Sequence, residues 1–407
     1  MSAASGESQR PRLRILVCPH ELVTGGSQLS AIDLAARLRD RGHTVQIYAP
    51  RGPLERRIAD LGLAYRAAPP GSARSLRPRA LYRLAQEIHR FRPDIVHSYE
   101  APPAVASAAV RVAVPHGAVV TVLSMEVPDF IPRDVPLIVG TAKIARGEAG
   151  RRSEVRLMEP PVDIDLDTPR PTVGARAALG IAPSAFVVSV VGRLSAEHDK
   201  ALGVVAAIEA LDGADLSRPV VLIVAGGGDR AEAVHSAAAA VRNPRLTVRL
   251  EGDVADPRQI YAAADVVLGM GSAALRAMAH ARPVIVQGAG GFWQTLTPES
   301  HETFLRDGFF GHGPSGAPSL ERQLAALMAD PHRAADLGRY GRALVVERFD
   351  IAAATRMLED VYAIESVGPH RGLRASAATV LRYARYRIVM TAPVVQRIHR
   401  RFRRNRG

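Results

Sequence analysis

The sequence predicts two successive α/β domains, each a doubly wound, mostly parallel sheet of Rossmann-like type. Three observations predict this fold class. The chain has 407 residues, which is too long for one ordinary hydrophobic core. Short apolar runs alternate with segments of helical periodicity along the chain. The alternation stops at a turn-rich stretch, PPVDIDLDTPRPTVG at 160–174, and then starts again.

In the N-terminal half, LRILVCP at 13–19 has the continuous apolar character of a buried parallel strand. The loop HELVTGGSQ follows, and apolar residues at helical spacing between Ser27 and Arg41 predict a helix. TVQIYAP then predicts a second strand, which completes the strand–helix–strand unit of a parallel crossover. The alternation continues with a helix at about 78–91, the strand DIVHSYE, a helix near 103–112, and the strands AVVTVLS, LIVGT and VRLME.

The C-terminal half repeats the pattern. The expected elements are the strand FVVSVVG, a helix at 200–211, the strand VVLIVAGGG, a helix at 229–242, the strand LTVRLEG, the short helix RQIYAAA, the strand DVVLGM, a helix at 272–281 and the strand PVIVQG. Helices near 319–329, 334–347 and 351–365 complete the body.

Domain boundaries follow from this alternation. Open parallel sheets bind ligands at the carboxyl ends of their strands, so the default site is a cleft between two facing domains. The predicted segments are a disordered N-terminus at 1–12, an N-terminal Rossmann-like domain at 13–165, a C-terminal Rossmann-like domain at 166–350, a closing helix at 351–367 that packs back on the N-terminal domain, and a basic amphipathic tail at 368–407.

The composition is that of a soluble globular protein, with 47% hydrophobic and 23% charged residues. The single cysteine, Cys18, excludes an internal disulfide and fits a reducing, cytoplasmic compartment. The first dozen residues lack the apolar stretch of a signal peptide, and no run of 18 apolar residues occurs. There is no cysteine pair, no H-E-x-x-H and no tight Asp/His cluster, so we expect no metal site.

The positive charge is concentrated in the tail. The formal net charge is +13, yet no acidic residue follows Glu365. Eleven of the net positive charges lie on Arg371, Arg374, Arg382, Arg385, Arg387, Arg397, Arg400, Arg401, Arg403, Arg404 and Arg406. The body is therefore close to neutral, and nucleic-acid binding would rest on the tail charge alone, without an aromatic stacking platform.

The tail also has an apolar face. Ile388, Thr391, Val395, Ile398 and Phe402 share one side of a helix, and we expect Pro393 to divide the tail into two short helices. A basic amphipathic segment suits an anionic membrane surface. A solvated tail, or an arm folded back on the body, are the alternatives.

The first candidate site is Thr24-Gly25-Gly26-Ser27, between the first strand and the first helix. Glycine lets the backbone approach a ligand closely, and the helix N-terminus offers amides to an anion. A tight turn with Ser27 as helix cap is the alternative. The G-x-G-x-x-G spacing of a dinucleotide fingerprint is absent.

The second candidate site is VVGRLSAEHDK at 190–200, where a strand ends at Gly192 and two cations precede a helix. Arg193 can bind phosphate through its planar fork and Lys200 as a point charge. Ordinary surface cations are the alternative. The chain has only two lysines, Lys143 and Lys200, which favours a function for Lys200 slightly.

Two further glycine-rich strand ends are candidates. Gly226-Gly227-Gly228 could approach a base or phosphate, or form a plain turn with Asp229 as N-cap. Gly271 and Ser272 open a helix whose amides could face an anion, with Ser272 as cap. His97 and His116 lie near strand ends, where a lone histidine is more often structural than catalytic.

Taken together, these stretches resemble the retaining glycosyltransferases of family four, which have the GT-B fold. The resemblance covers about 13–365. It rests on TGGSQLSAIDLAARLRDRGHTVQIYAP, RPDIVHSYEAP, PPVDIDLDTP, VVGRLSAEHDK, IYAAADVVL, LRAMAHARPVIV and ERFDIAAATRMLEDVY, in this order.

The resemblance implies that Arg193 and Lys200 hold the diphosphate of a nucleotide-sugar donor, which Gly25 and Gly26 approach from the other domain. Gly227, Gly271, Ser272 and Arg276 would complete the donor site. The resemblance thus makes 13–165 the acceptor domain and 166–350 the nucleotide-sugar donor domain. It further implies a metal-independent hexosyl transfer with retention of configuration, and no cofactor beyond the donor substrate. The expected acceptor is a cell-envelope or secondary-metabolite glycan, which could be lipid-linked at the inner face of the plasma membrane.

The sequence departs from the family pattern at three places. Leu268 and Arg276 stand where the family has paired glutamates, and Leu123 stands where it has a histidine. Arg276 cannot accept a hydrogen bond from a ribose hydroxyl, although it could contact phosphate. His116, Ser124 and Glu126 are the remaining candidates for a catalytic role in the N-terminal domain.

Two other functions stay open from the sequence. A non-catalytic homologue that binds a sugar nucleotide or a partner protein would account for the three departures. A nucleotide-sugar epimerase also uses two such domains, but it needs a carboxylate or histidine set for proton abstraction, which the sequence does not reveal.

Overall fold

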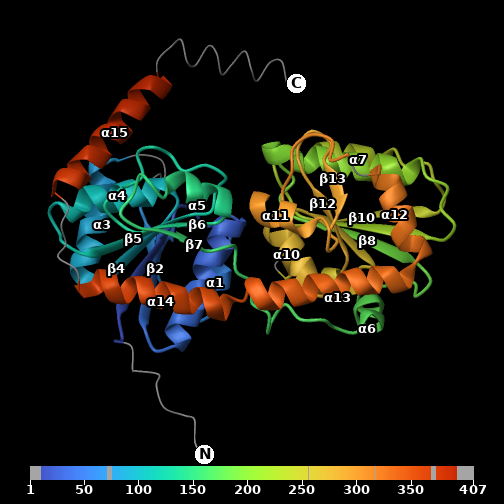
Figure 1. The fold of residues 1–407 in the computed structure, drawn as a ribbon, viewed down its shortest axis with the longest axis horizontal. Helices are drawn as coiled ribbons and strands as arrows, with labels where there is room; N and C mark the ends of the chain where they lie inside the picture. The colour runs from blue at the N-terminus through green and yellow to red at the C-terminus, as the bar shows by residue number, and fades with distance from the viewer. Residues whose placement is uncertain (1–10, 71–75, 255, 317, 368–372, 392–407) are drawn as a thin grey trace, which may run out of the picture. The chain divides into compact units, whose positions relative to one another are not determined.

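The computed structural model describes residues 11–70, 76–254, 256–316, 318–367 and 373–391. The chain forms two compact units (Figure 1). The first contains Met1–Met158 and Ala354–Gly407, and the second contains Glu159–Ala353. Each unit holds a predominantly parallel sheet with helices in the crossovers, which confirms the predicted fold class.

The sheet of the first unit has the order β3-β2-β1-β4-β5-β6-β7, and all its strands are parallel. The strands are β1 (Arg14–Pro19), β2 (Thr44–Pro50), β3 (Ala64–Ala68), β4 (Ile95–Tyr99), β5 (Gly117–Val122), β6 (Leu137–Val139) and β7 (Val155–Leu157). The order reverses between β1 and β4, and such switch points are where open sheets bind ligands.

The helices of this unit are α1 (Gly26–Asp40), α2 (Glu55–Asp60), α3 (Pro78–Phe91), α4 (Ala101–Arg111), α5 (Ala142–Glu148), α14 (Ile351–Val367) and α15 (Leu373–Thr391). Buried polar contacts tie α14 to the unit. The hydroxyl of Tyr362 lies 2.6 Å from His97 Nδ1, and His97 Nε2 lies 2.7 Å from Thr121 Oγ1. Burial lowers the pKa of His97 to about 3, so this histidine is neutral and structural.

The second unit has the sheet order β10-β9-β8-β11-β12-β13, in which only β13 pairs antiparallel. Its strands are β8 (Phe186–Val191), β9 (Val220–Ala225), β10 (Leu246–Gly252), β11 (Val266–Gly269), β12 (Val284–Gln287) and β13 (Trp293–Thr295). Its helices are α6 (Thr172–Ala178), η1 (Glu197–Asp199), α7 (Lys200–Asp212), α8 (Ala231–Ala239), α9 (Arg258–Ala263), α10 (Ser272–Ala279), α11 (His301–Asp307), α12 (Leu320–Ala329) and α13 (Pro331–Arg348).

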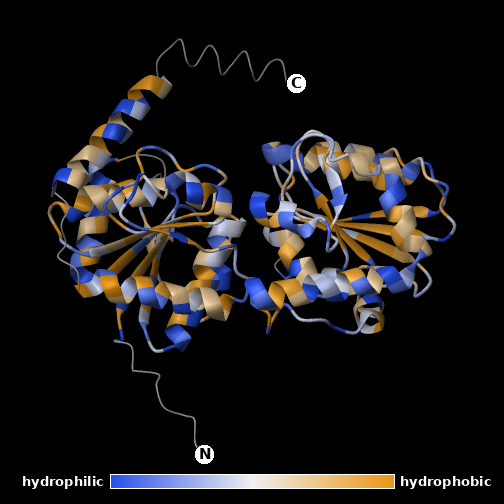
Figure 2. Ribbon diagram, viewed as in Figure 1, coloured by the Kyte–Doolittle hydropathy of each residue, from blue (hydrophilic) through white to orange (hydrophobic). Residues whose placement is uncertain are grey.

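The core of the second unit lies on both faces of this sheet. Val188 and Leu268 point to one face, where Val204 and Ile208 of α7 cover them. Val267 belongs to the cluster of apolar residues on the other face. Figure 2 shows the corresponding hydrophobic colouring of the central strands. Burial on both faces explains why the strands read as continuous apolar runs.

Within the described part of the tail, α15 is one continuous helix that packs on α4 (Figure 1). Phe130 contacts the rings of Tyr383 and Tyr386, with centroids 5.2 and 4.7 Å away. This segment is therefore an arm folded back on the body. Pro393 and the expected second helix lie outside the described residues. Among the described helices, none is both long and apolar enough to cross a bilayer.

Candidate functional site

The glycine loop of the first unit leads directly into α1. Gly25 takes the N-cap position in extended conformation and provides no side-chain cap. The first amides of a helix lack intrahelical acceptors, so this loop can present N–H groups to an anion. Ser27 is not the cap, because its hydroxyl donates to Glu100 Oε1 over 2.9 Å.

Glu100 was not identified from the sequence. It follows β4 directly and is 7% exposed. Its carboxylate accepts hydrogen bonds from Ser27 Oγ, the Leu123 amide and Ser124 Oγ. The sequence pattern that could have indicated it is an acidic residue at the end of an apolar strand, immediately before a helix.

The structure separates the predicted catalytic residues. His116 is 2% exposed, with Nδ1 2.7 Å from the Val114 carbonyl and Nε2 3.0 Å from Ser107 Oγ. It precedes β5 and therefore lies at the amino edge of the sheet, whereas Ser124 and Glu126 follow the same strand and are exposed. The contacts of His116 favour a structural role.

In the second unit, Arg193 and Lys200 lie beyond the carboxyl end of β8. Arg193 is partly buried, and the next residue, Leu194, donates its amide to the Gly227 carbonyl over 2.8 Å. Lys200 is the first residue of α7, and its Nζ lies 3.4 Å from Glu197 Oε2. The two cations therefore follow the same central strand of the sheet.

The start of α7, which follows β8, is held by a side chain from β12, two strands away in the sheet. Gln287, at the end of β12, donates from Nε2 to the carbonyls of Asp199 and Lys200, each over 3.2 Å. Asp199 Oδ2 accepts the Gly290 amide over 3.0 Å. The backbone of Lys200 is thus fixed at the strand ends, which limits where its ammonium group can reach.

The three glycines after β9 have a packing role. A Cβ on Gly226 would lie 1.8 Å from the Gly192 carbonyl oxygen, and one on Gly228 would lie 2.2 Å from that of Leu194. The Gly227 amide donates to Asp253 Oδ1 over 2.9 Å. The turn alternative is thus supported, but Asp229 is not the N-cap of α8, because Arg230 takes that position.

Gly271 and Ser272 open α10 as expected. Gly271 is the N-cap residue with φ of 53°, and its amide donates to the Phe309 carbonyl over 2.8 Å. Ser272 is the first residue of the helix and makes no capping bond. Leu268 lies inside β11 with 0% exposure, so this position belongs to the core and not to a ligand site.

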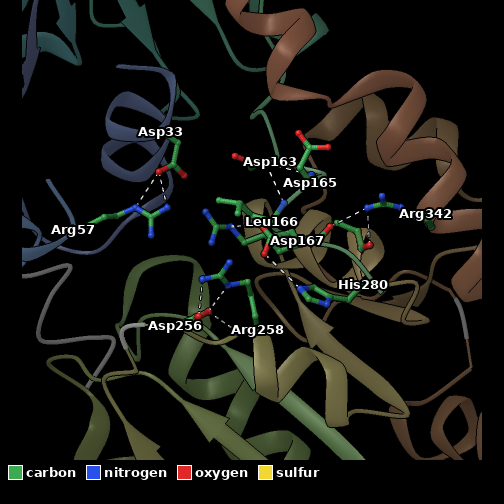
Figure 3. Close-up of polar contacts among 12 residues, drawn as sticks. Asp33, Arg57, Asp163, Asp165, Leu166, Asp167, Asp256, Arg258, His280 and Arg342 are labelled. Atoms are coloured by element: carbon green, nitrogen blue, oxygen red, sulfur yellow. Dashed lines mark hydrogen bonds and ion pairs between the residues drawn. The ribbon is translucent and has the colours of Figure 1, made fainter. Parts of the chain in front are cut away.

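Arg276 faces a carboxylate of its own unit. Its Nε lies 3.8 Å from Asp167 Oδ2, and Asp167 Oδ1 lies 3.5 Å from His280 Nε2. Figure 3 shows Asp167 beside His280, with Arg342 donating to the Asp167 carbonyl over 2.9 Å. Burial alone would raise the pKa of Asp167, but His280 and the charge of Arg276 outweigh it and lower the pKa. The carboxylate is therefore ionised at neutral pH.

The acidic stretch at 163–167 serves as a turn. Asp163 Oδ1 accepts the amides of Asp165 and Leu166, 3.3 and 3.2 Å away (Figure 3). Within the described part of the chain, no three His, Cys, Asp or Glu side chains group so that they could hold a metal ion.

The sheets and strand ends define a double Rossmann-like α/β protein. Residues 24–130 match the family model for Glycosyltransferase Family 4, and residues 185–330 match that for Glycosyl transferases group 1. These matches, one in each sheet-bearing unit, together cover more than half of the chain and identify it as a glycosyltransferase.

Solved structures share the fold. HepE of Anabaena in complex with UDP-glucose superposes with a TM-score of 0.68 at 20% identity, covering 86% of this chain and 99% of its own. A glycosyltransferase from Rickettsia africae gives 0.67 at 15%, covering 86% and 98%. Sucrose-phosphate synthase from Thermosynechococcus elongatus gives 0.65 at 17%, also covering 86% and 98%. Comparison with curated proteins gave no match.

Proposed function

We propose that this protein transfers a sugar from a nucleotide-sugar donor to a cell-envelope or secondary-metabolite glycan. The observation that carries the proposal is the placement of Arg193 and Lys200 after β8, with Lys200 opening α7. Cations and helix amides at this edge of a parallel sheet suit a diphosphate. The UDP-glucose complex of HepE supports a donor of this class.

The chemistry requires stabilisation of a leaving diphosphate. Cleavage of the sugar–phosphate bond develops negative charge on that group and positive charge on the sugar. Arg193 and Lys200 would stabilise the leaving group without a metal ion. We propose that Gly25 and Gly26 also bind the diphosphate, and that configuration is retained, as the resemblance to family four implies.

A second candidate function is that of a non-catalytic nucleotide-sugar-binding homologue. The interaction of Arg276 with Asp167 favours it, because Arg276 replaces a ribose-binding glutamate and is partly engaged within its own unit. Leu123, which replaces the family histidine, also favours a non-catalytic homologue. Leu268 gives no such support, since it lies in the core of β11.

A panel of UDP-, GDP- and ADP-sugars tests the donor. The thermal midpoint of the full-length chain should rise with at least one of them, because a ligand that binds only the folded state stabilises it. Turnover of that donor with glycan or lipid-linked acceptors supports the transferase. Binding without turnover supports the second candidate, and no shift with any donor contradicts both.

We propose that the tail brings the protein to the inner face of the plasma membrane, where such acceptors lie. Leu381, Ile388 and Val389 of α15 are 69%, 70% and 50% exposed, and Arg385 lies exposed among them. α15 carries no acidic residue. An exposed basic and apolar helix face matches an anionic lipid surface.

Co-sedimentation with vesicles containing phosphatidylglycerol tests the tail. We expect the chain to bind these vesicles, and to bind neutral phosphatidylcholine vesicles or vesicles in high salt weakly. Two variants should bind the phosphatidylglycerol vesicles less than wild type does. One is the triple variant Leu381→Ser, Arg385→Ser and Ile388→Ser, and the other is truncated after residue 367. Equal binding by wild type and both variants would exclude the tail as the attachment.

A further inference from the structure

Glu100 has an unusual backbone conformation for a residue with a side chain. Its φ and ψ are 70° and 175°, a region that is essentially restricted to glycine. Such conformations persist when the surrounding structure holds them, and they cluster at functional sites. Here the residue occupies the junction between β4 and α4, at the carboxyl edge of the first unit's sheet.

The Glu100 carboxylate joins two loops that are distant in the sequence. Oε1 accepts from Ser27 Oγ over 2.9 Å and from the Leu123 amide over 3.0 Å. Oε2 accepts from Ser124 Oγ over 2.6 Å. Because β4 lies between β1 and β5, a side chain at its end reaches both the glycine loop after β1 and the segment after β5.

The two carboxylate oxygens of Glu100 accept all three hydrogen bonds. A glutamine would keep one accepting oxygen, and its NH2 group could donate to Ser124 Oγ, because a serine hydroxyl also accepts. An alanine would remove all three contacts, so alanine is the substitution that tests them.

We propose that Glu100 is a positioning residue that holds the glycine loop and the Leu123–Ser124 segment in one arrangement for sugar transfer. This inference rests on the proposed function, which assigns the glycine loop to the donor diphosphate. Loop amides that act on charge developing in the transition state lose their effect when their position shifts slightly. Glu100 itself acts through Ser27, Leu123 and Ser124.

The kinetic test uses the full-length chain and Glu100→Ala. We expect kcat to fall at least tenfold while the donor KM changes less than threefold, because Arg193 and Lys200 of the second unit still bind the donor. Glu87→Ala is the matched control, since Glu87 is a buried carboxylate of the same unit that accepts from Gln46 Nε2 over 2.5 Å. A kcat of Glu100→Ala within threefold of wild type, or an equal loss in Glu87→Ala, would overturn the proposal.

Glu100→Ala and Glu100→Gly separate the carboxylate from the backbone strain. Glycine tolerates positive φ, so Glu100→Gly should have the higher thermal midpoint of the two. Both should have the same low kcat, since both lack the carboxylate. Recovery of kcat in Glu100→Gly would show that the strain, and not the carboxylate, matters.

Hydrogen exchange gives a readout that does not depend on turnover. In Glu100→Ala, the amides of 24–28 and of Leu123 should exchange faster than in wild type, with no change elsewhere in the first unit. If wild type turns over no donor, the proposed function fails and exchange alone decides the role of Glu100. Unchanged exchange in these segments would then refute the positioning role of Glu100.

Discussion

Arg193→Ala and Lys200→Ala should each abolish most of the thermal shift that the donor produces and lower kcat/KM about a hundredfold. Each cation is expected to contribute roughly 3 kcal/mol to stabilising the leaving diphosphate. Arg193→Lys should recover only part of the loss, because lysine keeps the charge but lacks the planar fork. Isothermal titration and steady-state kinetics measure both effects.

Arg218→Ala is the matched control for these variants. Arg218 precedes β9 at the amino edge of the same sheet, and its guanidinium donates to the Ser184 carbonyl over 2.7 Å. Its loss should leave donor binding unchanged. If Arg193→Ala and Lys200→Ala bind the donor as tightly as Arg218→Ala does, the phosphate site lies elsewhere.

Gly226→Ala should destabilise the second unit by about 3 kcal/mol or more. Gly226 has φ of 149°, and an added Cβ would lie 1.8 Å from the Gly192 carbonyl oxygen. The added Cβ would clash with backbone atoms, so no side-chain rotation can relieve the contact. Because Gly192 precedes Arg193, donor binding should weaken as well. Urea denaturation and the donor titration test the two effects.

Gly174→Ala should have the opposite effect on the stability of the second unit. Gly174 lies in α6, and an added Cβ would meet nothing within 4 Å. Alanine in a helix is favoured over glycine by up to about 1 kcal/mol, so the urea midpoint should rise. A Gly226→Ala variant as stable as wild type would show that the close approach of the two strand ends is not required.

The sequence by itself determined the two sheets and the loops that follow their strand ends. Apolar runs and helical periodicity are local properties, and they located strands such as β1 and β8 and the loops after them. The same patterns placed Gly25, Arg193 and Lys200 after strand ends, because the carboxyl end of a parallel strand is defined by chain direction alone.

Only the tertiary structure decided what individual residues contact. Glu100 accepts hydrogen bonds from two distant loops because β4 lies between β1 and β5 in the sheet. This strand order brings Ser27 and Ser124 to one carboxylate. Leu268 lies in the core because its strand pairs with β8 and β12, and Arg276 lies near Asp167 because of how α10 packs. Such contacts join positions far apart in the chain. They depend on strand order and side-chain packing, which no local pattern encodes.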